Sequence, residues 1–193
     1  MKYLLALLFS FLILATAGDK TLLKIGEKAP MFKLKNYDKK EYDLTKVMPE
    51  NKFTVIMFVS TECPVSNAYN GRMLNLFTTY SVQGVGFLGV NANKAETMQD
   101  IRKHAREKGF KFPVLKDELN KVADLYSAQV TPETFVLDSY GKLVYHGRID
   151  DNRDLEKVEV NDLGLALDAL LMKTTPPKTE AKAFGCSIKR VTP

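Results

Sequence analysis

Three stretches of the chain have the hydrophobic pattern of buried β-strands. Residues 53–59 and 85–90 are almost continuously apolar, which is typical of strands covered on both faces of a sheet. Residues 112–115 form a shorter extended run. Alternating apolar and polar positions predict antiparallel hairpins for residues 26–44 and for the two runs that flank the turn at residues 138–141.

Helical periodicity fills the intervals between these strands. A helix is predicted to begin at the Cys63-Pro64 pair, because proline is tolerated in a first helical turn, where its missing N–H needs no partner. Residues 94–108 predict a second helix with Asn93 as its N-cap, and residues 117–126 predict a third. Asn161 is predicted to cap a final helix. Strands that alternate with helices before a terminal hairpin indicate a layered α/β domain with a central mixed β-sheet.

Length and composition bound this interpretation. With 193 residues, the chain is expected to form one domain with a well-filled core, and 45% hydrophobic and 26% charged residues are ordinary for a globular protein. The net charge of +5 comes from basic residues that are scattered among acidic ones. Nucleic-acid binding is therefore not indicated, because it requires a concentrated basic stripe. His104 lies in the charged run of residues 102–108 and is expected on the surface. The acidic residues Asp150, Asp151 and Asp154, which Arg148 and Arg153 interrupt, are expected to form a solvated turn.

The N-terminus has the organisation of a signal peptide. Lys2 precedes an apolar run, and Ala15-Thr16-Ala17 then supplies the small residues that signal peptidase accepts. The run is shorter than the roughly 20 residues that span a bilayer, which disfavours the alternative of a membrane anchor. We therefore expect a signal peptide at residues 1–17, a domain at residues 18–172, and a linker and C-terminal tail at residues 173–193. The expected location is exported, either periplasmic or secreted, with no membrane anchor after cleavage.

The two cysteines, Cys63 and Cys186, are the candidate reactive groups. In an oxidising compartment, a pair of thiols tends toward a disulfide or toward redox chemistry. Cys63 lies where a predicted strand meets a predicted helix, and the N–H groups of a helix N-terminus stabilise the thiolate that acts as a nucleophile. The hydroxyl of Ser66 is expected to donate to this sulfur, whereas the charge of Glu62 opposes thiolate formation. The alternative is a buried and inert cysteine.

Four motifs resemble segments of a known family. Residues 26–32 resemble the redoxin entry segment, and residues 58–63 resemble the strand end that delivers the thioredoxin nucleophile. Thr131-Pro132 resembles the cis-proline loop, and residues 138–142 resemble the hairpin turn that follows it. Over residues 25–172, the chain is thus similar to the redoxin branch of the thioredoxin superfamily, which includes thiol peroxidases and exported thiol-disulfide enzymes.

This resemblance implies a thioredoxin-like fold with helices on both faces of the sheet. No cofactor is expected. No metal site is expected either, because copper-delivery relatives of this fold use two nearby thiols and a histidine, whereas this chain has one local thiol. It also implies a cis bond between Thr131 and Pro132, in a loop that faces Cys63, with the Thr131 backbone pairing with substrate. An ordinary trans turn is the alternative. Pro64 and Ser66 are expected to line the same substrate site.

Several positions depart from the family patterns. Thioredoxins carry Cys-x-x-Cys, whereas the fourth position here is Ser66, so a local disulfide cannot form. Peroxiredoxins carry proline and threonine where this chain has Ile56 and Ser60, and their arginine has no clear counterpart unless folding brings Arg148 near. Disulfide exchange is therefore favoured over peroxide reduction.

Three roles remain open for Cys186. It can resolve an oxidised Cys63 within the same molecule, form a permanent structural disulfide with it, or pair with another molecule. Closing a long loop costs only slowly more with its length, so the separation from Cys63 does not exclude an intramolecular bond.

The leading hypothesis is an exported thiol-disulfide oxidoreductase with Cys63 as nucleophile and Cys186 as the candidate resolving residue. Its expected partners are protein or small-molecule disulfides or peroxides, together with a thiol reductant. One alternative is a peroxiredoxin-like thiol peroxidase with antioxidant activity. The other is a redox-inactive module that binds a protein or delivers a metal, and the reactivity of Cys63 distinguishes it from the enzymes.

Overall fold

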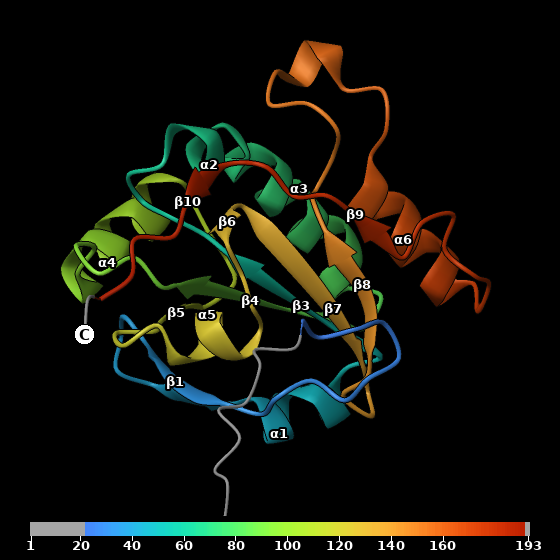
Figure 1. The fold of residues 1–193 in the computed structure, drawn as a ribbon, viewed down its shortest axis with the longest axis horizontal. Helices are drawn as coiled ribbons and strands as arrows, with labels where there is room; N and C mark the ends of the chain where they lie inside the picture. Colours follow the sequence, from blue (N-terminus) through green and yellow to red (C-terminus); the bar gives the residue numbers. More distant parts are fainter. Residues whose placement is uncertain (1–21, 192–193) are drawn as a thin grey trace, which may run out of the picture.

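An eight-stranded mixed sheet forms the centre of the protein in the computed structural model, which describes residues 22–191 (Figure 1). The strand order is β2-β1-β5-β4-β3-β7-β8-β9, and β10 and β6 form a separate pair. The strands are β1 (Lys33–Asn36), β2 (Glu41–Asp43), β3 (Phe53–Phe58), β4 (Val85–Asn91), β5 (Val114–Lys116), β6 (Val130–Thr131), β7 (Glu133–Asp138), β8 (Leu143–Gly147), β9 (Glu180–Ala181) and β10 (Cys186–Ser187). The signal peptide predicted for residues 1–17 lies outside the described residues.

Strand β3 lies in the middle of the sheet, between β4 and β7, and this position explains why its sequence is almost continuously apolar. It pairs in parallel with β4 and antiparallel with β7. Val55 and Met57 belong to the hydrophobic cluster on one face, whereas Ile56 and Phe58 belong to the cluster on the other. Because side chains alternate between faces along a strand, a strand covered on both sides is apolar at nearly every position.

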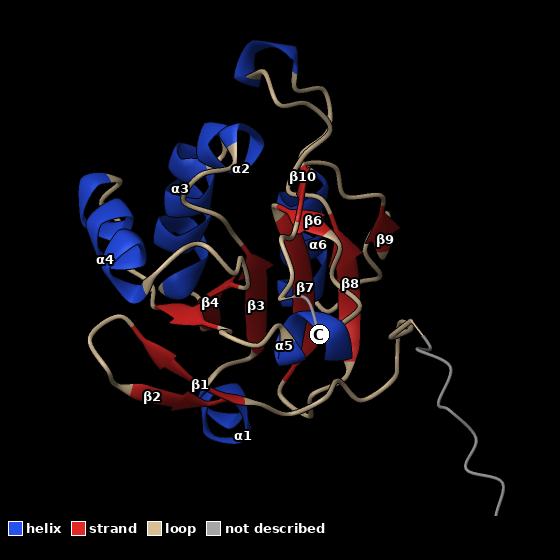
Figure 2. Cartoon of the chain, turned by 60° about the vertical axis from the view of Figure 1, so that its left-hand side comes forward, coloured by secondary structure: helices blue, strands red, loops and turns tan. Residues whose placement is uncertain are grey.

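Helices cover both faces of the sheet, as Figures 1 and 2 show. Residues of α3, α4 and α6 pack into the cluster that contains Val55, and residues of α1 and α5 pack into the cluster that contains Ile56. The predicted α/β architecture with a central mixed sheet is confirmed. The helices are α1 (Leu44–Val47), α2 (Pro64–Ala68), α3 (Asn70–Ser81), α4 (Met98–Glu107), α5 (Lys121–Leu125) and α6 (Asp162–Leu171), with short 3-10 turns η1 (Met48–Glu50) and η2 (Leu155–Lys157).

The start of α4 differs from the prediction. Asn93 was expected to cap a helix from residue 94, but the N-cap is Thr97, whose hydroxyl accepts from the Asp100 N–H while the Asp100 carboxylate accepts from the Thr97 N–H. This reciprocal pair satisfies two N–H groups that would otherwise lack partners. The residues before Thr97 therefore lie outside the helix, and their side chains bind other parts of the chain. The N-cap predicted for α6 is confirmed, because the Asn161 side chain accepts from the Gly164 N–H.

The C-terminal tail predicted for residues 173–193 carries two of the short strands. Strand β9 pairs in parallel with β8, at the edge of the main sheet. Strand β10 pairs antiparallel with β6, with Cys186 opposite Thr131 and Ser187 opposite Val130. The tail therefore returns across the domain to the loop that precedes Pro132 (Figure 1). No helix between residues 22 and 191 has both the length and the hydrophobicity needed to cross a bilayer.

Candidate active site

Cys63 is the N-cap of α2 and follows the carboxyl end of β3. Its side chain accepts a hydrogen bond from the Ser66 N–H, with 3.3 Å between nitrogen and sulfur, and Pro64 occupies the first helical turn. The Ser66 hydroxyl was expected to donate to the sulfur, but the donor is the Ser66 backbone N–H. Ser66 is fully buried, and its hydroxyl oxygen instead accepts from the Ser60 N–H at 3.1 Å. The loop thus aims a polar N–H at the sulfur, which favours its anionic form.

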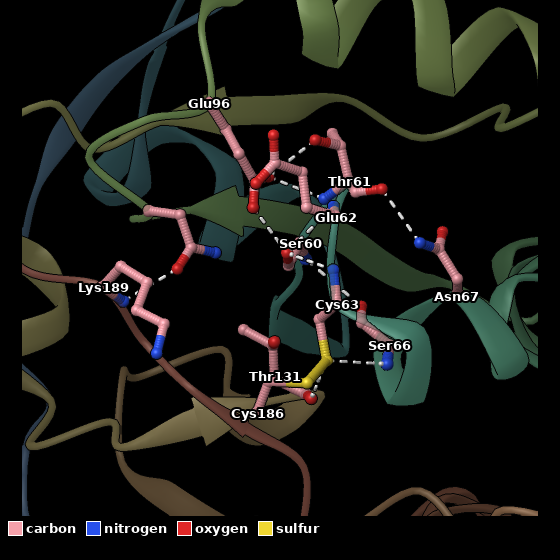
Figure 3. The surroundings of a disulfide bond; sticks show 11 residues. Ser60, Thr61, Glu62, Cys63, Ser66, Asn67, Glu96, Thr131, Cys186 and Lys189 are labelled. Carbon is pink, nitrogen blue, oxygen red and sulfur yellow. Dashed lines mark hydrogen bonds between the residues drawn. A yellow bond between two sulfur atoms is a disulfide. The ribbon is translucent and has the colours of Figure 1, made fainter.

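Cys63 and Cys186 form a disulfide, with their Cα atoms 5.9 Å apart (Figure 3). Pairing between β10 and β6 brings Cys186 opposite Thr131, and the Thr131–Pro132 bond is cis, as the family resemblance implies. The Thr131 carbonyl oxygen lies 3.4 Å from Cys63 Sγ. The cis-proline loop therefore faces the cysteine pair.

A groove of about 270 Å³ opens beside the disulfide. Cys63 itself is only 5% exposed, whereas Cys186 is partly exposed. Among the residues predicted for the site, the groove is lined by both cysteines, Pro64 and Thr131. Ser66, which is fully buried, and Pro132 do not line it. The remaining lining residues are Ser60, Glu62, Asn93, Glu96, Ser187 and Lys189.

Glu96 holds the loop that presents Cys63, although sequence reasoning did not identify it. It is 3% exposed, and its carboxylate accepts from the Ser60 hydroxyl at 2.5 Å and from the Thr61 N–H at 2.6 Å (Figure 3). It also accepts from the Thr61 hydroxyl and from the Asn91 side-chain amide. Ser60 Oγ in turn accepts from the Cys63 N–H at 2.9 Å. A buried carboxylate with this many donors fixes the loop geometry.

Lys116 is buried and is connected to Glu96 through Asn91. Its ammonium donates to the Asn91 side-chain oxygen at 3.2 Å and to the Asn93 carbonyl at 2.6 Å. Burial lowers the pKa of Lys116, while the nearby charge of Glu96 acts to raise it. The opposite charges of Lys116 and Glu96 therefore partly offset each other's cost of burial.

His104 is connected through Asn67 to Thr61, in the loop that precedes Cys63. Sequence reasoning placed it on the surface, but it is partly buried, and its Nε2 lies 2.6 Å from Asn67 Oδ1. The Asn67 amide in turn donates to the Thr61 carbonyl at 2.9 Å. Burial is the main cause that lowers the pKa of His104, followed by the charge of Lys108.

The cis-proline loop has its own support in Glu133, which follows Pro132. One carboxylate oxygen of Glu133 accepts from the N–H groups of Gln129 and Val130, and the other lies 2.7 Å from His146 Nε2. Glu133 is buried, so these partners replace the water that its carboxylate loses.

Two predicted surface features have other roles. Arg148 pairs with Asp162 at 2.6 Å, at the start of α6, and does not line the groove beside Cys63. Asp150 was interpreted as part of a solvated turn, which is wrong. It is 3% exposed and accepts from Arg72 and from the Tyr69 hydroxyl, because α3 packs against this turn.

Comparison with known proteins fits this geometry. The model of the AhpC/TSA family matches residues 25–146. The chain belongs to the AhpC/TSA family. A Halalkalibacterium halodurans relative called thiol-disulfide oxidoreductase ResA is 29% identical over 127 residues, which are 66% of this chain and 70% of the relative. Together, AhpC/TSA membership and the cysteine pair identify a thiol-dependent oxidoreductase.

Solved structures share the fold of this AhpC/TSA family member. A conserved protein from Geobacillus kaustophilus superposes with a TM-score of 0.83 and 34% identity, covering 89% of this chain and 95% of that one. A protein disulfide isomerase-like structure from Bacteroides thetaiotaomicron has a TM-score of 0.63 and 17% identity, covering 78% of this chain and 91% of that one. The thioredoxin-like fold implied by the sequence is confirmed.

Proposed function

We propose that the protein is an exported thiol-disulfide oxidoreductase that cycles between a Cys63–Cys186 disulfide and the corresponding dithiol. The observation that carries this proposal is the position of the disulfide, between the N-terminus of α2 and the cis-proline loop, beside an open groove. The similarity to ResA proteins, which are named for thiol-disulfide exchange, supports the same chemistry.

Cys63 is proposed as the nucleophile, because the Ser66 N–H stabilises its thiolate. The thiolate attacks one sulfur of a substrate disulfide, so the Cys63–substrate bond forms and the other substrate sulfur leaves as a thiolate. The deprotonated Cys186 then attacks Cys63 Sγ, which releases the second substrate thiolate and forms the Cys63–Cys186 disulfide. The substrate gains two electrons and the protein loses two. A thiol reductant returns the protein to the dithiol.

Pro64, Ser66, Thr131 and Pro132 are proposed to shape the substrate site. Pro64 and Thr131 border the groove, and Ser66 acts through its N–H on the sulfur. The pairing edge of Thr131, which the family resemblance assigns to substrate, is occupied by Cys186 of the tail in the disulfide form.

Peroxide reduction is the second candidate, because the AhpC/TSA family takes its name from alkyl hydroperoxide reductase and thiol-specific antioxidant proteins. The position of Arg148 disfavours it, since its guanidinium pairs with Asp162 and is not available to polarise a peroxide at Cys63. A structural disulfide with no turnover is the remaining alternative.

One set of variants separates these candidates. In Cys186→Ser, oxidised glutathione is expected to leave one glutathione on Cys63 that persists, whereas wild type should convert this adduct to the internal disulfide. Cys63→Ser should form neither product. Reduction of a protein disulfide such as that of insulin, driven by dithiothreitol, should require Cys63. If neither variant changes this rate, while peroxide consumption depends on Cys63, the peroxidase assignment replaces the proposal.

Export is part of the proposal and has a direct test. The signal-peptide pattern of residues 1–17 and the disulfide between the two cysteines both support it. Intact-mass measurement of protein made from the full-length gene is expected to show cleavage before Gly18. A full-length mass in the cytosolic fraction would contradict export but not the exchange chemistry.

A further inference from the structure

The end of the tail is fastened to the domain independently of the disulfide. Residues 188–191, here called the tail anchor, begin with Ile188, which is 5% exposed and packs into the hydrophobic cluster on the α5 face of the sheet. The Ile188 N–H donates to the Gln129 carbonyl at 2.9 Å. Removing this apolar side chain from water stabilises the docked position of the tail.

Two asparagine side chains add hydrogen bonds to the backbone of the tail anchor. Asn93 Oδ1 accepts from the Lys189 N–H at 2.8 Å, and the Lys189 carbonyl accepts from the Lys94 N–H at 2.8 Å. Asn120 Oδ1 accepts from the Val191 N–H at 2.6 Å. The turn before α4 is thus used to bind the tail, which explains why Asn93 does not cap the helix.

A charged side chain completes these contacts. The Arg190 guanidinium lies 3.0 Å from the Asp124 carboxylate and donates to the Ala128 carbonyl. Because both charged groups are about one third exposed, this pair adds specificity more than stability. None of the hydrogen bonds described for the tail anchor involves either cysteine.

We infer that the tail anchor stays docked when the disulfide is reduced, and that Asn93 and Asn120 are positioning residues that keep Cys186 beside Cys63. This inference rests on the proposed exchange function. Cys186 is two residues from Ile188, and an extended chain of two residues is about 7 Å long. The docked anchor therefore keeps the Cys186 sulfur close to Cys63. Without the anchor, Cys186 would be held only by the two-residue pairing of β10 with β6 and, farther back, by β9. When so short a pairing opens, the tail becomes a flexible tether, and flexible tethers give effective concentrations in the millimolar range.

Equilibration with glutathione tests the anchor. Two glutathione thiols and the protein disulfide exchange with the protein dithiol and oxidised glutathione, so the equilibrium constant reports the effective concentration of Cys186 at Cys63. Asn93→Ala and Ile188→Ala are expected to lower the ratio of disulfide to dithiol at least tenfold. Asn93→Asp, which keeps the acceptor oxygen, should restore most of it. Asn75→Ala, an exposed asparagine on α3, is the matched control and should leave the ratio unchanged.

Hydrogen exchange of the reduced wild type gives a readout that does not depend on turnover. The N–H groups of Ile188, Lys189 and Val191 are expected to remain protected after reduction. Exchange at the rate of an unstructured peptide, or an unchanged equilibrium ratio in both Ala variants, would overturn the anchor and leave the exchange function intact. A reduced wild type that oxidised glutathione converts neither to the adduct nor to the internal disulfide would overturn the thiol-disulfide exchange function. The hydrogen-exchange rates would still decide whether the anchor exists.

The folding of the variants has its own control. In a Cys186→Ser background, the far-UV circular dichroism spectrum of Asn93→Ala should match that of the parent protein, because the Asn93 side chain accepts its hydrogen bond from the tail. A loss of helix signal there would mean that Asn93→Ala disturbs the domain itself, and the equilibrium shift would then count against the anchor.

Discussion

At the scale of single residues, the most consequential side chain is Glu96. Four donors surround its buried carboxylate, and one of them, the Ser60 hydroxyl, passes the constraint to the backbone of Cys63. A carboxylate is suited to this position because it only accepts hydrogen bonds, and every group that faces it is a donor. Cys63 is therefore positioned by a residue that is distant in sequence.

Glu96→Gln should destabilise the protein by about 1–3 kcal/mol, because the introduced amide donor faces donors and leaves a buried hydrogen bond unmade. Urea denaturation measures the loss in the free energy of unfolding. Glu62→Gln removes the same charge from an exposed neighbour of Cys63 and should change this free energy by no more than about 0.5 kcal/mol. Equal stability of the two variants would contradict the structural role of Glu96.

His104 gives the protein a predictable response to pH. Its pKa is lowered from 6.5 in the folded protein, so the unfolded chain binds a proton more readily. The contribution of His104 to stability is then complete above about pH 6.5 and declines as the pH falls below it. Between pH 7 and pH 5, the unfolding free energy of wild type should fall more steeply than that of His104→Gln. Parallel curves in urea denaturation would show that His104 does not contribute.

At the scale of elements, the region before α4 shows how one sequence offers two helix starts. Asn93 and Glu96 have the spacing of a capping box, and so do Thr97 and Asp100. Only the second pair forms the box. The first pair is engaged elsewhere, since Asn93 binds the tail and Glu96 binds the Cys63 loop. Local signals do not distinguish these starts, because the deciding partners come from other parts of the chain.

The short β10 strand depends on a glycine. A Cβ atom on Gly185 would overlap the Thr131 carbonyl oxygen, so Gly185→Ala should separate β10 from β6 and slow formation of the internal disulfide at least tenfold. Quenched alkylation followed by mass measurement gives this rate. Gly71→Ala in α3, where the added methyl group meets open space, is the control and should leave the rate unchanged. A similar rate in Gly185→Ala would mean that the tail reaches Cys63 without the β10–β6 pairing.

At the scale of the whole molecule, the disulfide closes a long loop that runs from α2 to β10, since the two cysteines are 123 positions apart. Removing it should lower the free energy of unfolding by about 2–4 kcal/mol, because the unfolded chain regains the freedom of that loop. Urea denaturation of oxidised wild type and of Cys186→Ser measures the difference. Reduced wild type should resemble the variant, and a variant as stable as the oxidised protein would contradict the prediction.

Local pattern was sufficient for the elements of the sheet and for the position of Cys63. The apolar runs that became β3 and β4, the Cys63-Pro64 helix start and the Asn161 cap all depend on neighbours within one turn or one strand. Such short-range preferences are written directly into consecutive residues.

Long-range contacts decided the rest. The burial of Asp150 against α3, the role of Glu96 behind Cys63, and the seat of the tail on Asn93 join residues from separate elements. The pairing of Cys63 with Cys186, which the sequence left open among three possibilities, was decided when β10 aligned with β6. A buried polar group forms hydrogen bonds with the groups that the fold places beside it. These partners come from distant parts of the chain, so the pattern of adjacent residues does not predict them.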